Sequence, residues 1–303
     1  MSALITYVFA QFDPRPVGQD KNNGIIADAD EGRNLMGIEV TIPHLAERCK
    51  LGNLDHHGPE DSAETPSAVE QALSAELPPA GAMLATVRCD TDSIGAMAVL
   101  ANRAAGREVD EVLVRAIGAF DRLGPAAGRP GDEVISIARQ AANFRMPLSE
   151  RVEWVQSVLD GTYDEAEVSE LVAARDKEFE AATEASEVTL HADGRIASVV
   201  SKHRFATNLG YEAASVLVCF NPEMPVDFRD PSKGTYLKYT LCRYDSHVPV
   251  DLVAAMAELN ELDPAAVEGA RWGGRGDIGG SPQGISSGLE LEQVLEVVER
   301  HLK

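Results

Sequence analysis

One stretch of the chain constrains its fold more than any other, because a strand, a carboxylate-rich turn and a helix follow one another directly. Residues 82–88 are rich in β-forming side chains, Asp90 and Asp92 lie in the turn, and residues 97–103 form an apolar helical run. Gly95 lets the helix begin close to the strand. This order predicts an α/β fold on a parallel sheet, in which functional residues gather at the carboxyl ends of the strands.

Asp90 and Asp92 are the first candidates for chemistry. Two carboxylates two positions apart in an extended turn share one face, and the N-terminus of the following helix favours a bound anion. The alternative is structural, with one Asp capping the helix and the other lying in the loop.

Asp55, His56 and His57 form a second candidate site. Only 7 of the 303 residues are histidine, so an acid followed by two adjacent histidines is an unusual sequence here. Carboxylate and imidazole are ligands of divalent cations. The run 50–54 before them is short and the run 58–62 after them consists of turn formers, which predicts a strand end. The alternative is a pair of surface histidines beside an N-capping Asp.

Two more acidic strand ends are expected in the same part of the chain. Residues 25–27 are interpreted as a strand that ends at Asp28 and Asp30, although an ordinary acidic turn is an open alternative. Residues 108–117 are interpreted as a strand that ends near Asp121. If these ends converge, they fit two divalent cations about 3.5–4 Å apart. The expected metal ligands are Asp28, Asp30, Asp55, His56, Asp90, Asp92 and Asp121. Mn²⁺ suits this mixed set, and Mg²⁺ and Zn²⁺ are alternatives.

The chain length predicts two domains. We expect an α/β parallel-sheet catalytic domain over residues 1–146, a long helical linker over 147–186 and a smaller α+β domain over 187–303. A first strand is expected at 4–9, and a hairpin turn at 192–194 opens the second domain. Further helices are expected at 64–73, 131–144, 250–259 and 289–302.

A glycine- and arginine-rich loop lies near the end of the chain. Residues 271–280 contain five glycines and two arginines. Glycine lets the backbone come close to an anion, and guanidinium groups bind phosphate or carboxylate. The residues expected to bind substrate here are Arg271, Gly273, Gly274, Arg275 and Gly276. The alternative is a flexible loop before the last helix.

Composition limits the partners. The formal net charge is −22, with 49 acidic and 27 basic residues and no basic block, so binding along a long nucleic acid is disfavoured. The acidity also fits a high-salt host or simple solubility. The four cysteines show no C-x-x-C spacing, and no apolar run approaches the roughly 20 residues of a membrane helix. We therefore expect a cytoplasmic protein with free thiols and neither a signal peptide nor a membrane partner.

The Asp55-His56-His57 run, the Asp90-x-Asp92 loop, the long connecting helix and the C-terminal glycine-rich motif together resemble the DHH phosphoesterase superfamily. The resemblance implies a dinuclear manganese site in the first domain and substrate binding in the second. It implies that Asp90, Asp92 and His56 ligate metal and that His57 contacts substrate or metal, with Asp28 and Asp121 as candidates for the remaining aspartates. The expected catalytic residues are accordingly His57, Asp90 and Asp92.

Three departures from the superfamily pattern stand out. The D-x-D motif follows the D-H-H motif instead of preceding it, which a circularly permuted catalytic domain would explain. Thr86 stands where the superfamily has a histidine, with Asp13, Asp28 or His44 as candidate replacements. Arg275 stands where the C-terminal motif has a histidine.

The sequence thus predicts a metal-dependent phosphoesterase that hydrolyses a small phosphorylated substrate, such as a nucleotide or short oligonucleotide, with a metal-activated water. Two alternatives remain open. One is a non-catalytic nucleotide or anion sensor on the same scaffold, and the other is a dinuclear hydrolase of non-phosphate substrates. A homodimer is compatible with the sequence.

Overall fold

The computed structural model describes residues 6–15, 18–57, 65–228, 230–244 and 247–303. The chain divides into two compact units, Met1–Arg175 and Asp176–Lys303. The division falls inside the 20-residue helix α8 (Glu165–Glu184), within the helical stretch expected at 147–186. Each unit is described by itself.

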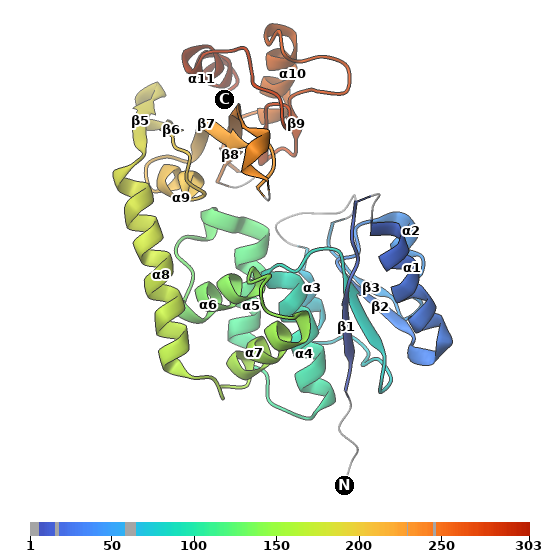
Figure 1. The fold of residues 1–303 in the computed structure, drawn as a ribbon. Coiled ribbons are helices and arrows are strands. Elements are labelled where there is room, and N and C mark those ends of the chain that lie inside the picture. The colour runs from blue at the N-terminus through green and yellow to red at the C-terminus, as the bar shows by residue number, and fades with distance from the viewer. Residues whose placement is uncertain (1–5, 16–17, 58–64, 229, 245–246) are drawn as a thin grey trace. The chain divides into compact units, whose positions relative to one another are not determined.

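Unit 1 is built on a four-stranded parallel sheet (Figure 1). Its strands, in spatial order, are β1 (Val8–Gln11), β4 (Met83–Thr86), β2 (Leu35–Ile38) and β3 (Asn53–Leu54). Because β4 pairs with β1 and β2, and β2 pairs with β3, all in parallel, the four carboxyl ends lie at one edge. The first strand begins at Val8, and the expected residues 4 and 5 lie outside the described part of the chain.

Helices cover both faces of this sheet. One face packs with α1 (Gln19–Asp28), α2 (Pro43–Ala46) and the core around Phe12, Val40 and Leu45. The other packs on the helix α4 (Thr91–Ala104), whose residues 91–102 are all buried. The small side chains of α4 suit this position because they let neighbouring helices come close. Four helices lie around α4: α3 (Ala68–Gln71), α5 (Glu111–Leu123), α6 (Asp132–Ala141) and α7 (Leu148–Leu159).

Two predicted strands are wrong. Residues 25–27 belong to α1, and residues 111–117 of the predicted strand 108–117 belong to α5. Within α5 the buried residues are Val114, Ile117 and Gly118, which is the spacing of a helix face and not the alternation of a strand. Asp110 starts this helix by accepting bonds from the amides of residues 112 and 113. The predicted helix at 131–144 is confirmed as α6.

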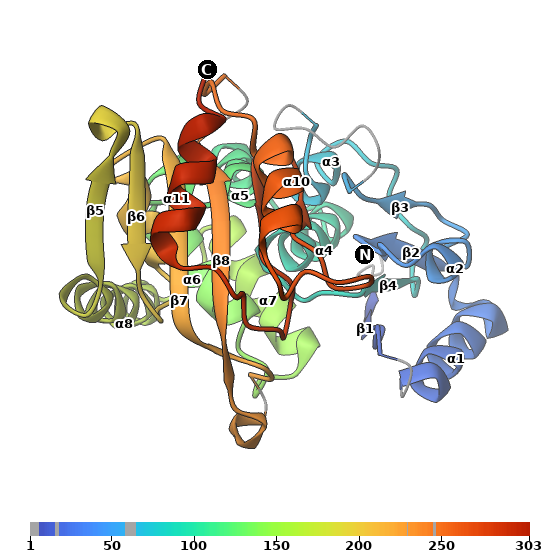
Figure 2. The ribbon, with the colours of Figure 1, turned by 90° about the horizontal axis from the view of Figure 1, so that it is seen from above.

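Unit 2 contains a six-stranded mixed sheet in the order β5-β6-β7-β8-β10-β9. Only β6 and β7 pair in parallel. Helices α10 (Leu252–Leu262) and α11 (Leu291–Arg300) pack on one face (Figure 2). Helix α9 (Ala206–Tyr211) packs on the other face. The strands are β5 (Glu187–His191), β6 (Ile196–Val200), β7 (Val216–Pro225), β8 (Thr235–Arg243), β9 (Gly273–Gly274) and β10 (Ile278–Gly280).

The fold class is therefore as predicted: a parallel-sheet α/β unit, a long helix and a smaller α+β unit. Among the described helices, none combines the length and the apolar character required to cross a bilayer.

Candidate metal centre

The candidate centre lies at the carboxyl edge of the parallel sheet in unit 1, where Glu39 directly follows β2. Glu39 is only 3% exposed and has a φ of +53°, a left-handed conformation that costs a non-glycine residue about 1–2 kcal/mol. Its amide donates to the carbonyl of Leu54 at 2.8 Å, and the Asn53 side chain bonds both the amide and the carbonyl of Val40. Strand β3 therefore holds this strained turn in place, as is common at functional sites.

His56 follows β3 and is the centre of the cluster. Its side chain is 5% exposed, and its Nε2 lies 3.3 Å from Oε1 of Glu39 and 3.1 Å from Oδ2 of Asp121. Asp121 belongs to the last turn of α5, so a helix end, and not the predicted strand end, brings this carboxylate to the imidazole. Asp121 thus lies next to His56 as expected, but it belongs to a helix and not to the predicted strand.

Asp92 lies in the first turn of α4 and is fully buried. Both of its oxygens accept backbone amides at the start of α3, from Ala68 at 2.8 Å and from Val69 at 2.9 Å. Asp90 caps α4 through the amide and hydroxyl of Ser93. Asp90 therefore caps the helix, as the structural alternative in the sequence analysis expects for one of the two aspartates. Asp92 lies in the helix and not in the loop, and it anchors the start of α3.

His57 lies at the rim of the cluster with its side chain 40% exposed. Its Nδ1 is 3.1 Å from Oδ1 of Asp55 and 3.3 Å from Oε1 of Glu39, and its amide donates to the same Asp55 oxygen. Asp55 therefore fixes both the backbone and the ring of His57. The turn formers at 58–62 lie outside the described residues.

The pKa values reflect crowding of acids in a buried space. Burial raises the pKa of Glu39 to about 9, against a hydrogen bond with His56, and the charges of Asp92, Asp90 and Asp121 add to the rise. Burial also raises the pKa of Asp92. Hydrogen bonds to Asp121 and Glu39 raise the pKa of His56 to about 10. A divalent cation would stabilise the ionised carboxylates and the neutral imidazole instead.

These residues fit a metal ion. One ligand atom each from Glu39, His56, Asp92 and Asp121 lie within 4.8 Å of one another, and Glu39, His56 and His57 form a second group of the same kind. The buried Oε1 of Glu39 lies 3.3 Å from Nε2 of His56 and 3.3 Å from Nδ1 of His57. Oxygen and imidazole donors at this spacing suit Mn²⁺, Mg²⁺ or Zn²⁺.

Glu39 is the site residue that the sequence analysis misses. A usable signal was present, because the apolar run 35–38 ends directly at this acid, which is the same strand-end pattern used for the other candidates. The left-handed backbone of Glu39 has no counterpart in the sequence.

Asp28 and Asp30 are not brought to this cluster. Asp28 is the last residue of α1, and Asp30 lies in the short π-helix η2 (Ala29–Arg33) that follows. The Asp30 carboxylate pairs on the surface with Arg48 at 2.5 Å and Lys50 at 2.9 Å. The expectation of a strand end here fails because the three-residue apolar run is part of a helix.

The glycine-rich stretch of unit 2 is an ordered hairpin formed by β9 and β10. A Cβ on Gly274 would lie 2.3 Å from the Cα of Gly279, so only glycine fits there. Nε of Arg275 lies 3.4 Å from Oδ1 of Asp277, and a terminal guanidinium nitrogen of Arg271 lies 3.6 Å from Oε1 of Glu261. Residues Gly273–Gly274 and Ile278–Gly280 are thus paired strands, and Arg271, Arg275 and Gly276 lie outside them.

Trp272 anchors the start of this hairpin. It is 3% exposed, and its indole donates to the buried Asp263 at 2.8 Å. Asp263 also accepts bonds from the Ser287 hydroxyl and from the amides of Ala265 and Gly288. One buried carboxylate thus joins three segments of unit 2.

No protein-family model and no curated protein matches the chain. Among solved structures, the chain is similar to the pGpG-specific phosphodiesterase PggH from Vibrio cholerae. The similarity covers 97% of this chain and 97% of that chain, at 10% sequence identity and a TM-score of 0.44. A similarity this distant says nothing about the reaction, so the function of this chain is inferred from its own residues.

Proposed function

We propose that the chain is a metal-dependent phosphoesterase that hydrolyses a small phosphorylated substrate. The observation that carries this proposal is the convergence of Glu39, His56, Asp92 and Asp121 at one buried edge of the sheet. Three acids and an imidazole, with Asp121 the most exposed of the four side chains, destabilise the fold unless protons or a cation neutralise the carboxylates. The proposal agrees with the resemblance of the two motifs to the DHH phosphoesterases.

The ligand set that we propose is Glu39, His56, Asp92 and Asp121. These four residues would hold a first ion, and a second ion is proposed by analogy with the dinuclear sites that the two motifs resemble. Mn²⁺ is the preferred ion. A bound divalent pair supplies a water of lowered pKa and neutralises the charge of the transferring phosphoryl group.

His57 and Asp55 form the part of the site that contacts substrate in this proposal. Contacts with Asp55 and Glu39 occupy Nδ1 of His57, so Nε2 is the ring nitrogen left for a phosphate oxygen. Asp90 acts by capping α4, the helix that carries Asp92. For unit 2 by itself, the proposed anion-binding residues are those of the β9–β10 hairpin: Arg271, Gly273, Gly274, Arg275 and Gly276.

The test is Mn²⁺-dependent hydrolysis of bis-p-nitrophenyl phosphate and of dinucleotides. Glu39→Gln and Asp121→Asn should each lower kcat/KM by at least about 100-fold. Asp20→Asn, on the exposed start of α1, is the matched control and should change little. Activity that persists in excess chelator, or in both cluster variants, would contradict the proposal.

A binding protein is the second candidate, and one observation favours it. Both oxygens of Asp92 already accept amide bonds from α3, which weakens the case for a fully liganded second metal. This candidate predicts that nucleotides raise the melting temperature without turnover. Metal analysis separates the two, since near two ions per chain supports the enzyme and none after dialysis supports the binder. A panel of non-phosphate esters tests the remaining hydrolase alternative.

A further inference from the structure

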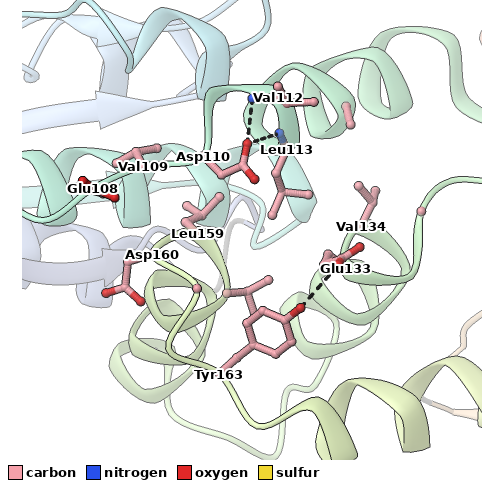
Figure 3. A pocket seen from close by; sticks show the side chains of 14 residues that line it. Glu108, Val109, Asp110, Val112, Leu113, Glu133, Val134, Leu159, Asp160 and Tyr163 are labelled. Carbon is pink, nitrogen blue, oxygen red and sulfur yellow. Dashed lines mark hydrogen bonds between the residues drawn. The ribbon is translucent and has the colours of Figure 1, made fainter.

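A cavity in unit 1 lies away from the candidate metal centre (Figure 3). It measures about 660 Å³ and lies among the start of α5, the start of α6 and the end of α7. Along α5, Val112 at the cavity and Asp121 at the metal centre are roughly 14 Å apart. The volume falls within the range of sites for small organic ligands.

The floor of the cavity is apolar. Val109, Leu113, Val134, Val158 and Leu159 line it. Val112 also lines it and is 79% exposed, an unusual position for a large aliphatic side chain on a helix. A ligand with a short hydrocarbon chain would cover this surface and gain about 25 cal/mol for each Å² of apolar area buried.

The polar lining of the cavity carries charge of one sign. Glu108, Asp110, Glu133 and Asp160 all line it, and no lysine or arginine does. Asp160 lies 3.5 Å from Arg107, which is not a lining residue, so part of its charge is already balanced. Glu133 accepts a hydrogen bond from Tyr163 at 3.3 Å, and Figure 3 shows this pair on one side of the cavity with Asp110 on another.

We propose that this cavity binds a small organic ammonium ion that carries a short alkyl chain. The chain would pack on the apolar lining, and the ammonium group would contact Glu133, with Asp110 adding to the negative potential of the cavity. The ring of Tyr163 adds a surface that attracts cations. An anionic phosphate compound would be repelled here, so the ligand differs in class from the proposed substrate.

The experiment is calorimetric titration of the full-length protein with n-hexylammonium chloride at about 0.15 M salt, which screens the general attraction of an acidic protein for cations. The neutral 1-hexanol and the anionic hexanoate are the comparison ligands. Hexylammonium should bind at least about tenfold more tightly than hexanol, because a charged contact adds to the same apolar one. Hexanoate should not bind. Methyl NMR shifts should be confined to Val112, Leu113 and their neighbours in the cavity.

Two charge-neutralising variants complete the test. Glu133→Gln should weaken hexylammonium binding about fivefold or more while hexanol binding is unchanged. Glu150→Gln, an exposed residue of α7 outside the lining, removes the same charge and should leave both affinities unchanged. Equal affinities for hexylammonium and hexanol, or equal weakening in the two variants, would overturn the proposal.

Discussion

The start of α3 is the structural element that we expect to control Asp92, and Glu70 is the residue that tests this. Glu70 accepts the amide of Ser67 at 3.0 Å in a capping box and forms an ion pair with Arg122 of α5. The two side chains of this pair are only 12% and 16% exposed. Arg122 follows Asp121, so the last turn of α5 both contributes a carboxylate to the metal centre and secures α3.

Glu70→Gln keeps a capping side chain and removes the charge. Loss of a largely buried charged hydrogen bond should lower the free energy of unfolding by about 2 kcal/mol, which corresponds to about 4–8 °C for a unit of this size. Because the amides of Ala68 and Val69 orient Asp92, Mn²⁺ affinity should also fall by about 10- to 100-fold.

Thermal unfolding of the metal-free protein measures the first effect, and Mn²⁺ titration at a temperature where the variant is fully folded measures the second. Arg115→Gln is the matched control on α5. Its pair with Glu111 is 65% and 67% exposed, so its loss should change stability by less than about 0.5 kcal/mol. If Glu70→Gln is destabilised but binds Mn²⁺ with unchanged affinity, α3 does not position Asp92 and the reasoning is refuted.

Three further predictions concern other parts of the chain. Burial would raise the pKa of Asp263, but hydrogen bonds from Ser287, two backbone amides and Trp272 keep this pKa below its usual range. The stability that Asp263 contributes is therefore present at neutral pH and is lost as the pH falls below about 4. Asp263→Asn should flatten this acid dependence of the stability of unit 2, measured by urea unfolding at several pH values, and an unchanged pH dependence would argue against it. Gly274→Ala should disrupt the hairpin and raise KM with little change in bound metal, and a normal KM would separate this hairpin from substrate binding. Asp28→Asn and Asp30→Asn should leave metal content unchanged, and loss of metal in either would restore that residue as a metal ligand.

The fold class is predictable from the sequence because neighbouring residues determine the strand, the turn and the helix at residues 82–104. β-forming residues, a capping Asp and a glycine occur in the order that the structure uses. Short runs of β-branched residues are less informative. In α5, the β-branched residues Val112, Val114 and Ile117 favour a strand by composition, yet the buried positions of α5 follow a helical period. Tertiary packing on α4 decides between the two.

The candidate site is less predictable than the fold, because its geometry depends on contacts between distant segments. Glu39 takes part only because Asn53 and Leu54 of β3 hold a left-handed turn after β2. No local pattern encodes that turn. Asp121 reaches His56 from a helix that the sequence analysis reads as a strand, so the correct residue follows from an incorrect element.

The D-x-D motif illustrates how the same residues can serve structure and chemistry together. Asp90 caps α4, and Asp92, two residues later in the first turn, accepts the first amides of α3 with both oxygens. Each carboxylate oxygen has two lone pairs, so an amide bond leaves room for a metal. The amide bonds also draw electron density from the carboxylate, which makes it a weaker ligand than Glu39. Asp92 should therefore contribute less than Glu39 to metal affinity, so Asp92→Asn should weaken Mn²⁺ binding less than Glu39→Gln does.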